Sequence, residues 1–251
     1  MARRIITLLT DFGTADGYVG EMRGVLLSAV PDADLVDIAH DIPPHDVDTA
    51  RLTLARIWRG FPASTVHLVV VDPGVGSARV AVAVASEGRF LVGPDNGVLS
   101  PALFDSARVV ALPVSSRASP TFHGRDVFAP AAAALARGAA IESLGAEHRN
   151  PIRRCTPEPT RRSDGSIVGE IIAIDRFGNA VTNLTARDTG AIDLGDLTLP
   201  TCRVYADVDV GGPLALAGSS GLIEIAVREG SAAAHLGAKR GDRVVLRPAA
   251  G

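Results

Sequence analysis

The chain has few cysteines, little net charge and no long hydrophobic run, and each of these absences excludes a class of protein. Its two cysteines, Cys155 and Cys202, do not form a C-x-x-C pair, so neither a zinc knuckle nor a dithiol redox site is expected. Lys and Arg number 25 against 28 Asp and Glu, a net charge of −3. This balance gives no strong attraction to nucleic acid or to an anionic membrane.

The sequence also lacks the features of membrane-spanning and exported proteins. No apolar run reaches the roughly 20 residues that span a bilayer. The Met-Ala-Arg-Arg start is not followed by the apolar core of a signal peptide. We therefore expect a cytoplasmic protein.

Several familiar motifs of nucleotide-binding proteins and hydrolases are absent. The glycine-rich segment 72–79 lacks the Gly-Lys-Ser/Thr of a P-loop, and no G-x-G-x-x-G follows the first apolar run. The segment 218–221 does not match the G-x-S-x-G of a serine hydrolase. Two histidines lie in the segment 40–46, but no further His or Cys pair has ligand spacing, so a metal site is not expected.

The periodicity of the chain predicts two domains of different texture. Residues 1–150 alternate apolar runs with segments of helical period, which predicts an α/β layered domain with a mostly parallel sheet. Its predicted strands lie at 5–10, 66–71, 80–85, 90–92 and 107–112. Its predicted helices begin near Tyr18 and end before Pro31, run from Asp46 to Arg59, and run from Asp126 to Arg137.

Beyond this domain the helical period disappears. Residues 151–166 are rich in proline and charge and are predicted to form a linker. Residues 167–251 carry strand candidates at 167–174, 201–208, 222–227 and 243–246, which indicates a small β-barrel or sandwich.

Three apolar runs of the first domain end in loops that carry an acid. Asp11 follows residues 5–10, Asp72 follows residues 69–71, and Asp95 follows residues 90–92. Ligands of open α/β sheets bind just beyond the carboxyl ends of the strands. The three loops are therefore predicted to converge on one crevice, provided that the strands are parallel neighbours.

Other residues in the chain allow two interpretations. His123 directly precedes a predicted helix, where its imidazole faces either a pocket or the core. The segment 175–179 combines Asp175, Phe177 and Asn179, which suits either a ligand or a tight turn stabilised by its own side chains.

Taken together, these segments resemble the S-adenosylmethionine hydroxide adenosyltransferase family, whose relatives include fluorinating and chlorinating enzymes. The resemblance covers nearly the whole chain. It is carried by LTDFG at 9–13, HDIPP at 40–44, VDPGVG at 71–76, GPDNG at 93–97, TFHGRD at 121–126 and IDRFGN at 174–179.

The resemblance implies hydrolysis of S-adenosylmethionine (SAM) at the ribose C5′ atom, giving adenosine and methionine. The catalytic Asp, Arg and His of the family match Asp72, Arg79 and His123. In the halogenating branch the positions of Asp72 and His123 are typically tyrosine and that of Val75 is threonine, so this chain resembles the enzymes that use water.

The resemblance also implies the substrate contacts and the assembly. Asp11 matches the residue that binds the ribose hydroxyls, Asp175 the one that meets the methionine ammonium, and His45 an aromatic residue that packs on the nucleoside. Ser219 and Ser220 match a loop at the methionine carboxylate, although the halogenating enzymes carry arginine at the position of Ser220. The full set of substrate-binding residues is Asp11, His45, Gly124, Asp175, Phe177, Asn179, Ser219 and Ser220.

The family fold is an α/β domain joined to a small β-barrel, assembled as a homotrimer with sites at subunit interfaces. No cofactor and no metal is implied, since SAM is itself the substrate. The implied partner is a small molecule.

A sulfonium leaves without help from an acid, so the chemistry must act on the nucleophile. Asp72 would accept a proton from water while Arg79 fixes the carboxylate and His123 orients or relays; alternatively, Arg79 and His123 would stabilise a bound hydroxide. Two other functions remain open, a non-catalytic sensor of SAM or adenosine and a halide-dependent halogenase. The carboxylate of Asp72 disfavours the latter because it would repel an incoming anion.

Overall fold

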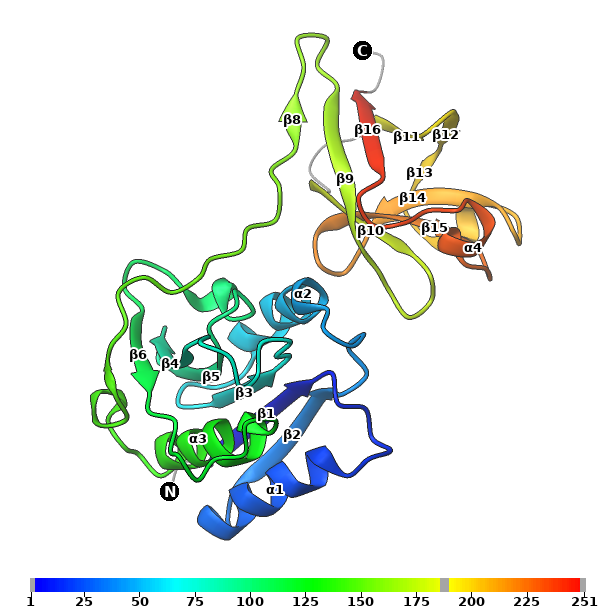
Figure 1. Ribbon diagram of the computed structural model, residues 1–251. Coiled ribbons are helices and arrows are strands. Elements are labelled where there is room, and N and C mark those ends of the chain that lie inside the picture. Colours follow the sequence, from blue (N-terminus) through cyan, green and yellow to red (C-terminus); the bar gives the residue numbers. More distant parts are fainter. Residues whose placement is uncertain (1–2, 186–189, 249–251) are drawn as a thin grey trace. The chain divides into compact units, whose positions relative to one another are not determined.

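The chain divides into two compact units, Met1–Cys155 and Thr156–Gly251, each with its own hydrophobic core. The computed structural model describes residues 3–185 and 190–248 (Figure 1). None of the helices in these two ranges has both the length and the apolar character that crossing a bilayer requires.

The first unit is built on a seven-stranded sheet, counted over the described residues, with the order β2-β1-β3-β5-β4-β6-β7. The strands β2, β1, β3 and β5 are parallel neighbours, β4 is antiparallel to β5 and β6, and β7 is antiparallel to β6. Five strands therefore run in one direction, which confirms the predicted α/β fold with a mostly parallel sheet. The bounds are β1 Ile5–Thr10, β2 Asp34–Ala39, β3 Val66–Val70, β4 Ala81–Ser86, β5 Arg89–Pro94, β6 Arg108–Leu112 and β7 Ala146–Glu147.

Helices cover both faces of this sheet. Helix α1 (Tyr18–Ala29) packs beside α3 (Ala129–Ala136) on one face, and α2 (Val47–Ile57) covers the other (Figure 1). Side chains alternate between the faces along each strand. In β1, Leu8 joins the core under α1 and α3, and Leu9 joins the core under α2. Because both faces are covered, β3 is buried along its whole length.

The strand order places a topological switch point between β1 and β3. From β1 the chain crosses to β2 on one side, and it later returns to place β3 on the other side. In the register of this pair Thr10 lies opposite Val70, the last residue of β3. Loops that leave two such strands in opposite directions open a crevice between them, which is where ligands of this class of sheet bind.

The second unit is a curled sheet of nine strands, counted over the residues that the structure describes, with the order β12-β11-β16-β9-β10-β15-β14-β13 and β8 paired to β9 (Figure 1). Its two ends approach each other, because β13 contacts β11, β12 contacts β14, and the Thr201 hydroxyl donates to the Gly190 carbonyl. The sheet is thus a nearly closed barrel, as predicted. The bounds are β8 Thr160–Arg161, β9 Ile167–Ile174, β10 Ala180–Thr185, β11 Gly190–Leu194, β12 Leu197–Leu199, β13 Thr201–Cys202, β14 Pro213–Ala217, β15 Leu222–Val227, α4 Ala232–His235 and β16 Arg243–Pro248.

Two predicted elements differ from the structure. The strand predicted over 201–208 ends at Cys202 and is followed by a 3-10 turn over Tyr205–Asp207. The Asp207 carboxylate accepts hydrogen bonds from the backbone N–H groups of Arg203 and Val204, which turns the chain. The helix predicted from Asp126 begins as a π-helical turn over Gly124–Phe128 and becomes α-helical only at Ala129.

Candidate active site

Asp72 stands two residues beyond the end of β3, and its side chain is only 5 % exposed. Two consecutive turns return the chain toward it. The N–H of Val75 donates to the carbonyl of Asp72 at 3.2 Å, and the N–H of Ser77 donates to the carbonyl of Gly74 at 3.1 Å. These turns bring Arg79 back to the strand end from which the loop departed.

Arg79 forms a buried ion pair with Asp72. Its Nε atom lies 2.9 Å and 3.0 Å from the two carboxylate oxygens, and its Nη2 atom contacts Oδ2. The Arg79 side chain is 9 % exposed, and its Cζ atom lies 5.1 Å from the centre of the Phe128 ring. A guanidinium fixed by a carboxylate and an aromatic face in this way has little freedom to move.

His123 completes a contiguous triad with these two residues. Its Nδ1 atom lies 2.8 Å from Nη2 of Arg79, and the residue is 5 % exposed. A guanidinium can only donate, so Nδ1 is the acceptor and His123 is a neutral imidazole protonated at Nε2. Burial and then the charge of Arg79 lower the pKa of His123, against the opposing influence of Asp72 and Asp126.

One donor of this triad lacks a partner. The Nη1 atom of Arg79 is buried and has no hydrogen-bond acceptor among the described residues. Leaving a buried donor unsatisfied costs about 1–3 kcal/mol, so such groups usually face water or a ligand oxygen. The triad thus offers a donor to an oxygen atom placed beside it.

Asp11 lies on the other side of the switch point, directly after β1. Its Oδ2 atom accepts a hydrogen bond of 2.8 Å from the backbone N–H of His45. The backbone of His45 has φ 68°, a left-handed conformation that a non-glycine residue rarely adopts. The loop that carries His45 is therefore tied to the carboxylate of Asp11.

Gly124 lies at a tightly packed point next to His123. A Cβ atom there would lie 3.1 Å from Sδ of Met22 and 3.4 Å from the ring of Phe12. The Phe12 ring also packs on Tyr18 and Phe122, with centroids 5.8 Å away in both cases. These aromatic residues are not among those that the sequence predicts for the site.

The third acid-bearing loop takes a structural part. β5 is the parallel neighbour of β3, as the prediction required. The carboxylate of Asp95, however, is 2.9 Å from Nε2 of His148 and accepts from the N–H of Ile152 at 2.7 Å. Its neighbour Asn96 instead donates to the carbonyl of Val71 at 2.8 Å, so this loop supports the strand end that carries Asp72.

In the second unit the segment 175–179 forms a tight turn. Oδ1 of Asp175 accepts from the N–H groups of Phe177 and Asn179 at 2.9 Å and 2.8 Å, and Oδ2 accepts from the Asn179 amide at 3.0 Å. The turn interpretation therefore holds for the backbone. The same turn leaves the Phe177 ring 78 % exposed, so it presents an aromatic face to the outside of the unit.

Tyr205 lies beside this turn and is not among the predicted site residues. Burial, then Glu224 and Asp175, raise the pKa of its hydroxyl, and a hydrogen bond with Asn179 opposes the rise. The sequence does not indicate Tyr205 as a site residue, because the segment 201–208 is predicted to be a strand. Ser219 and Ser220 lie in the exposed turn between β14 and β15, where the N–H of Gly221 donates to the carbonyl of Gly218 at 3.0 Å.

The predicted site residues thus fall into groups, each of which lies within one of the two units. The first unit brings together Asp72, Arg79 and His123, and separately Asp11 and His45. The second unit brings together Asp175, Phe177 and Asn179. Within residues 3–185 and 190–248 no three His, Cys, Asp or Glu side chains gather as metal ligands.

Comparison with known proteins matches both units to one family. Residues 6–145 match the SAM hydroxide adenosyltransferase N-terminal domain, and residues 169–245 match its C-terminal domain. An (R)-S-adenosyl-L-methionine hydrolase of Thermus thermophilus is 41 % identical over 97 % of this chain and 99 % of its own length. A fluorinase of Actinopolyspora mzabensis is 29 % identical, with 97 % of each chain covered.

The fold matches a solved structure with equal coverage. An uncharacterized conserved protein from Thermotoga maritima superimposes with a TM-score of 0.88 at 33 % sequence identity, covering 96 % of this chain and 99 % of the other.

Proposed function

The chain belongs to the SAM hydroxide adenosyltransferase family, and we propose that it hydrolyses SAM to adenosine and methionine at a site built around Asp72, Arg79 and His123. The observation that carries the site assignment is the buried contact of these three groups at the switch point. Within this contact, Nη1 of Arg79 is a buried donor that has no acceptor among the described residues.

The proposed reaction is a single displacement at C5′ of the ribose. A bond forms between the water oxygen and C5′ while the bond from C5′ to sulfur breaks, and its electron pair neutralises the sulfonium to give the thioether of methionine. The proton lost by water passes to the Asp72 carboxylate. Because the leaving group is already cationic, neither an acid nor a cofactor is needed to expel it.

Arg79 and His123 have distinct proposed roles. The guanidinium holds the Asp72 carboxylate in one orientation and offers Nη1 to the attacking oxygen. His123, with its proton on Nε2, orients that oxygen as a donor or relays its proton. If hydroxide is the nucleophile, the same two donors stabilise it.

The proposed substrate contacts are those that the resemblance to the family implies, and charge complementarity supports the contacts of Asp11 and Asp175. Asp11 binds the ribose hydroxyls, Asp175 the methionine ammonium, and Phe177 and Asn179 the adenine. His45 and Gly124 complete the nucleoside contacts. Ser219 and Ser220 bind the methionine carboxylate as neutral donors in place of an arginine.

We also propose a homotrimer with substrate sites at subunit interfaces, and a cytoplasmic location. Size-exclusion chromatography with light scattering tests the oligomeric state. A homotrimer would have about three times the 25.9 kDa mass of one chain. Fractionation of the cells that produce the protein tests its location.

Reaction in ¹⁸O-water, followed by mass spectrometry of the nucleoside, tests the reaction. We expect the label in the 5′-hydroxyl of adenosine. Both epimers at sulfur are assayed, because the Thermus relative is named for the (R) form. Binding without product would identify a sensor, and a 5′-halogenated nucleoside formed with chloride or fluoride would identify a halogenase.

A further inference from the structure

The loop that carries Asp72 and Arg79 is held at both of its ends by one neighbouring loop. Just before Asp72, the carbonyl of Val71 accepts from the Asn96 amide at 2.8 Å. Just after Arg79, the carbonyl of Val80 accepts from the backbone N–H of Asp95 at 2.9 Å. Residues 95 and 96 thus fix the separation of the two points from which the buried ion pair is built.

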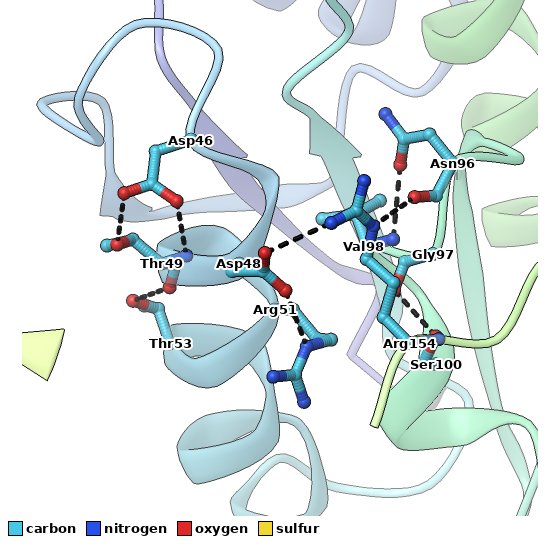
Figure 2. Close-up of polar contacts among 10 residues, drawn as sticks. All are labelled: Asp46, Asp48, Thr49, Arg51, Thr53, Asn96, Gly97, Val98, Ser100 and Arg154. Carbon is cyan, nitrogen blue, oxygen red and sulfur yellow. Dashed lines mark hydrogen bonds and ion pairs between the residues drawn. The ribbon is translucent and has the colours of Figure 1, made fainter. Parts of the chain in front are cut away.

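This loop is in turn held by the segment 148–154, at the end of the first unit. His148 and Ile152 hold the Asp95 carboxylate. Arg154 binds the loop twice, because its Nε donates to the carbonyl of Asn96 at 2.8 Å and its backbone N–H donates to the Ser100 hydroxyl at 2.8 Å (Figure 2).

The side chain of Arg154 has a prepared place in the structure. Gly97 has φ +92°, and a Cβ atom there would lie 2.3 Å from Cγ of Arg154, so only glycine leaves room for the arginine stem. Beyond the stem, Nη1 donates to Oδ2 of Asp48 on α2 at 3.0 Å, and the same carboxylate binds Arg51 through Oδ1 at 3.3 Å (Figure 2). Figure 2 shows the guanidinium lying between helix α2 and the main chain of the loop.

We propose that Arg154 is a positioning residue for hydrolysis, acting through Asn96 and Val71 to hold Asp72 against Arg79. Four contacts in series carry this inference: Asp48 to Arg154, Arg154 to Asn96, Asn96 to Val71, and Asp72 to Arg79. Arg154 also lies two residues before Thr156, where the second unit begins. The inference rests on the proposed function, since it concerns the same ion pair.

Arg154→Ala tests the inference by steady-state kinetics of adenosine release. Small displacements of reacting groups cost on the order of tenfold to a hundredfold in rate, so we expect kcat to fall by about tenfold or more with KM within about twofold. Arg154→Lys keeps a donor and a charge and is expected to recover part of the loss. Arg149→Met is the matched control, because the Arg149 side chain is 80 % exposed and pairs with Glu147.

Gly97→Ala tests the same contact from the other side. Its methyl group would displace the Arg154 stem, so kcat should fall as in Arg154→Ala. In the double variant the clash is gone and only the backbone strain of alanine at φ +92° remains, so kcat should equal that of Arg154→Ala within about twofold. Gly88→Ala, which is strained at φ +74° without a close contact, is the control for that strain. If Arg154→Ala does not fold, as judged by circular dichroism and Tm, Gly97→Ala decides by the same criteria.

A readout that does not depend on turnover separates this inference from the proposed function. NMR titration of His123 reports how closely Arg79 is held, and its pKa should move upward in Arg154→Ala and stay unchanged in Arg149→Met. The inference is overturned if kcat stays within twofold of wild type, or if the pKa of His123 does not move. If the wild-type protein releases no adenosine, the proposed function fails and the NMR result alone decides the inference.

Discussion

Gly76 lies so close to the carbonyl oxygen of Pro120 that a Cβ atom at residue 76 would be 2.3 Å from it. This contact joins the loop of Asp72 and Arg79 to the loop that leads into His123. Gly76 also has φ +75°, a conformation that disfavours any other residue. The close approach of two main chains therefore permits Arg79 to reach the imidazole.

Gly76→Ala is expected to separate these loops and to lower kcat by about tenfold or more. Gly88→Ala is the matched control, because Gly88 also has positive φ (+74°) but its Cβ would make only an ordinary contact of 3.7 Å with Ala63. Both variants should lose about 1 kcal/mol of stability to backbone strain. Adenosine release measured beside Tm distinguishes them, and equal activity of the two variants would contradict the role of the loop contact.

Asp72→Asn keeps the shape of the side chain but removes its charge and its basicity. Loss of a proton acceptor typically costs roughly 10² to 10⁴ in rate, so kcat should fall by that factor while the Kd for SAM changes little. Calorimetry gives Kd, and chromatography of the products gives kcat. Asp105→Asn is the control, because Asp105 is exposed and this variant should leave both values unchanged. A higher Kd for SAM with an unchanged kcat would assign Asp72 to substrate binding instead.

Much of this arrangement is visible in the sequence because it is local. The apolar run 66–71 ends at Asp72, and the glycines between Asp72 and Arg79 indicate the turns that bring the two together. The strands β1, β3 and β9 and the end of α1 before Pro31 follow from periodicity and are confirmed.

The remainder depends on contacts between distant segments. β2 and β10 are not predicted, since β2 is only half-buried and β10 interrupts its apolar residues with Thr182 and Asn183. Nor does any local pattern reveal that Asp95 faces His148, or that Arg154 closes on Asn96 across 58 positions. Such pairings are set by the sheet order, which periodicity alone does not give.

The decrease of kcat at acidic pH is expected to occur at a lower pH than the titration of an ordinary histidine. Only neutral His123 can accept the hydrogen bond from Arg79, and burial together with that guanidinium lowers its pKa below 6.5. The neutral form, and with it kcat, is therefore retained at pH 6.5 and lost only at more acidic pH. NMR titration compared with the kcat profile checks this, and a decrease at or above pH 6.5 would contradict it.

Asp11→Asn is expected to weaken binding more than turnover. The amide keeps an acceptor for the N–H of His45 but loses the second carboxylate oxygen, which the proposed contact with the ribose diol would use. Hydrogen bonds to charged groups contribute about 1.5–3 kcal/mol, so the Kd for SAM should rise by roughly 10- to 100-fold. Calorimetry on Asp11→Asn measures this directly, and unchanged affinity would remove Asp11 from the ribose site.

His67 makes the stability of the first unit depend on pH independently of catalysis. It is fully buried in β3, with Nδ1 2.8 Å from the Thr7 hydroxyl and its ring edge-on to Phe61. Burial, reinforced by the charge of Arg89 and opposed by the main chain of Trp58, lowers its pKa to about 4.

Because the unfolded chain binds this proton near pH 6.5 and the folded chain only near pH 4, the contribution of neutral His67 is complete above pH 6.5. It is lost progressively as the pH falls from 6.5 to 4, and at pH 4 the accumulated loss in the free energy of unfolding is about 3 kcal/mol. The free energy of unfolding, measured with denaturant from pH 7 to pH 4, should therefore fall more steeply in wild type than in His67→Phe. Each protein is compared with its own free energy of unfolding at pH 7. His235→Gln is the control at an exposed position and should show the same pH dependence as wild type. If the free energy of unfolding of His67→Phe falls as steeply as that of wild type, His67 does not take up a proton on unfolding between pH 7 and pH 4.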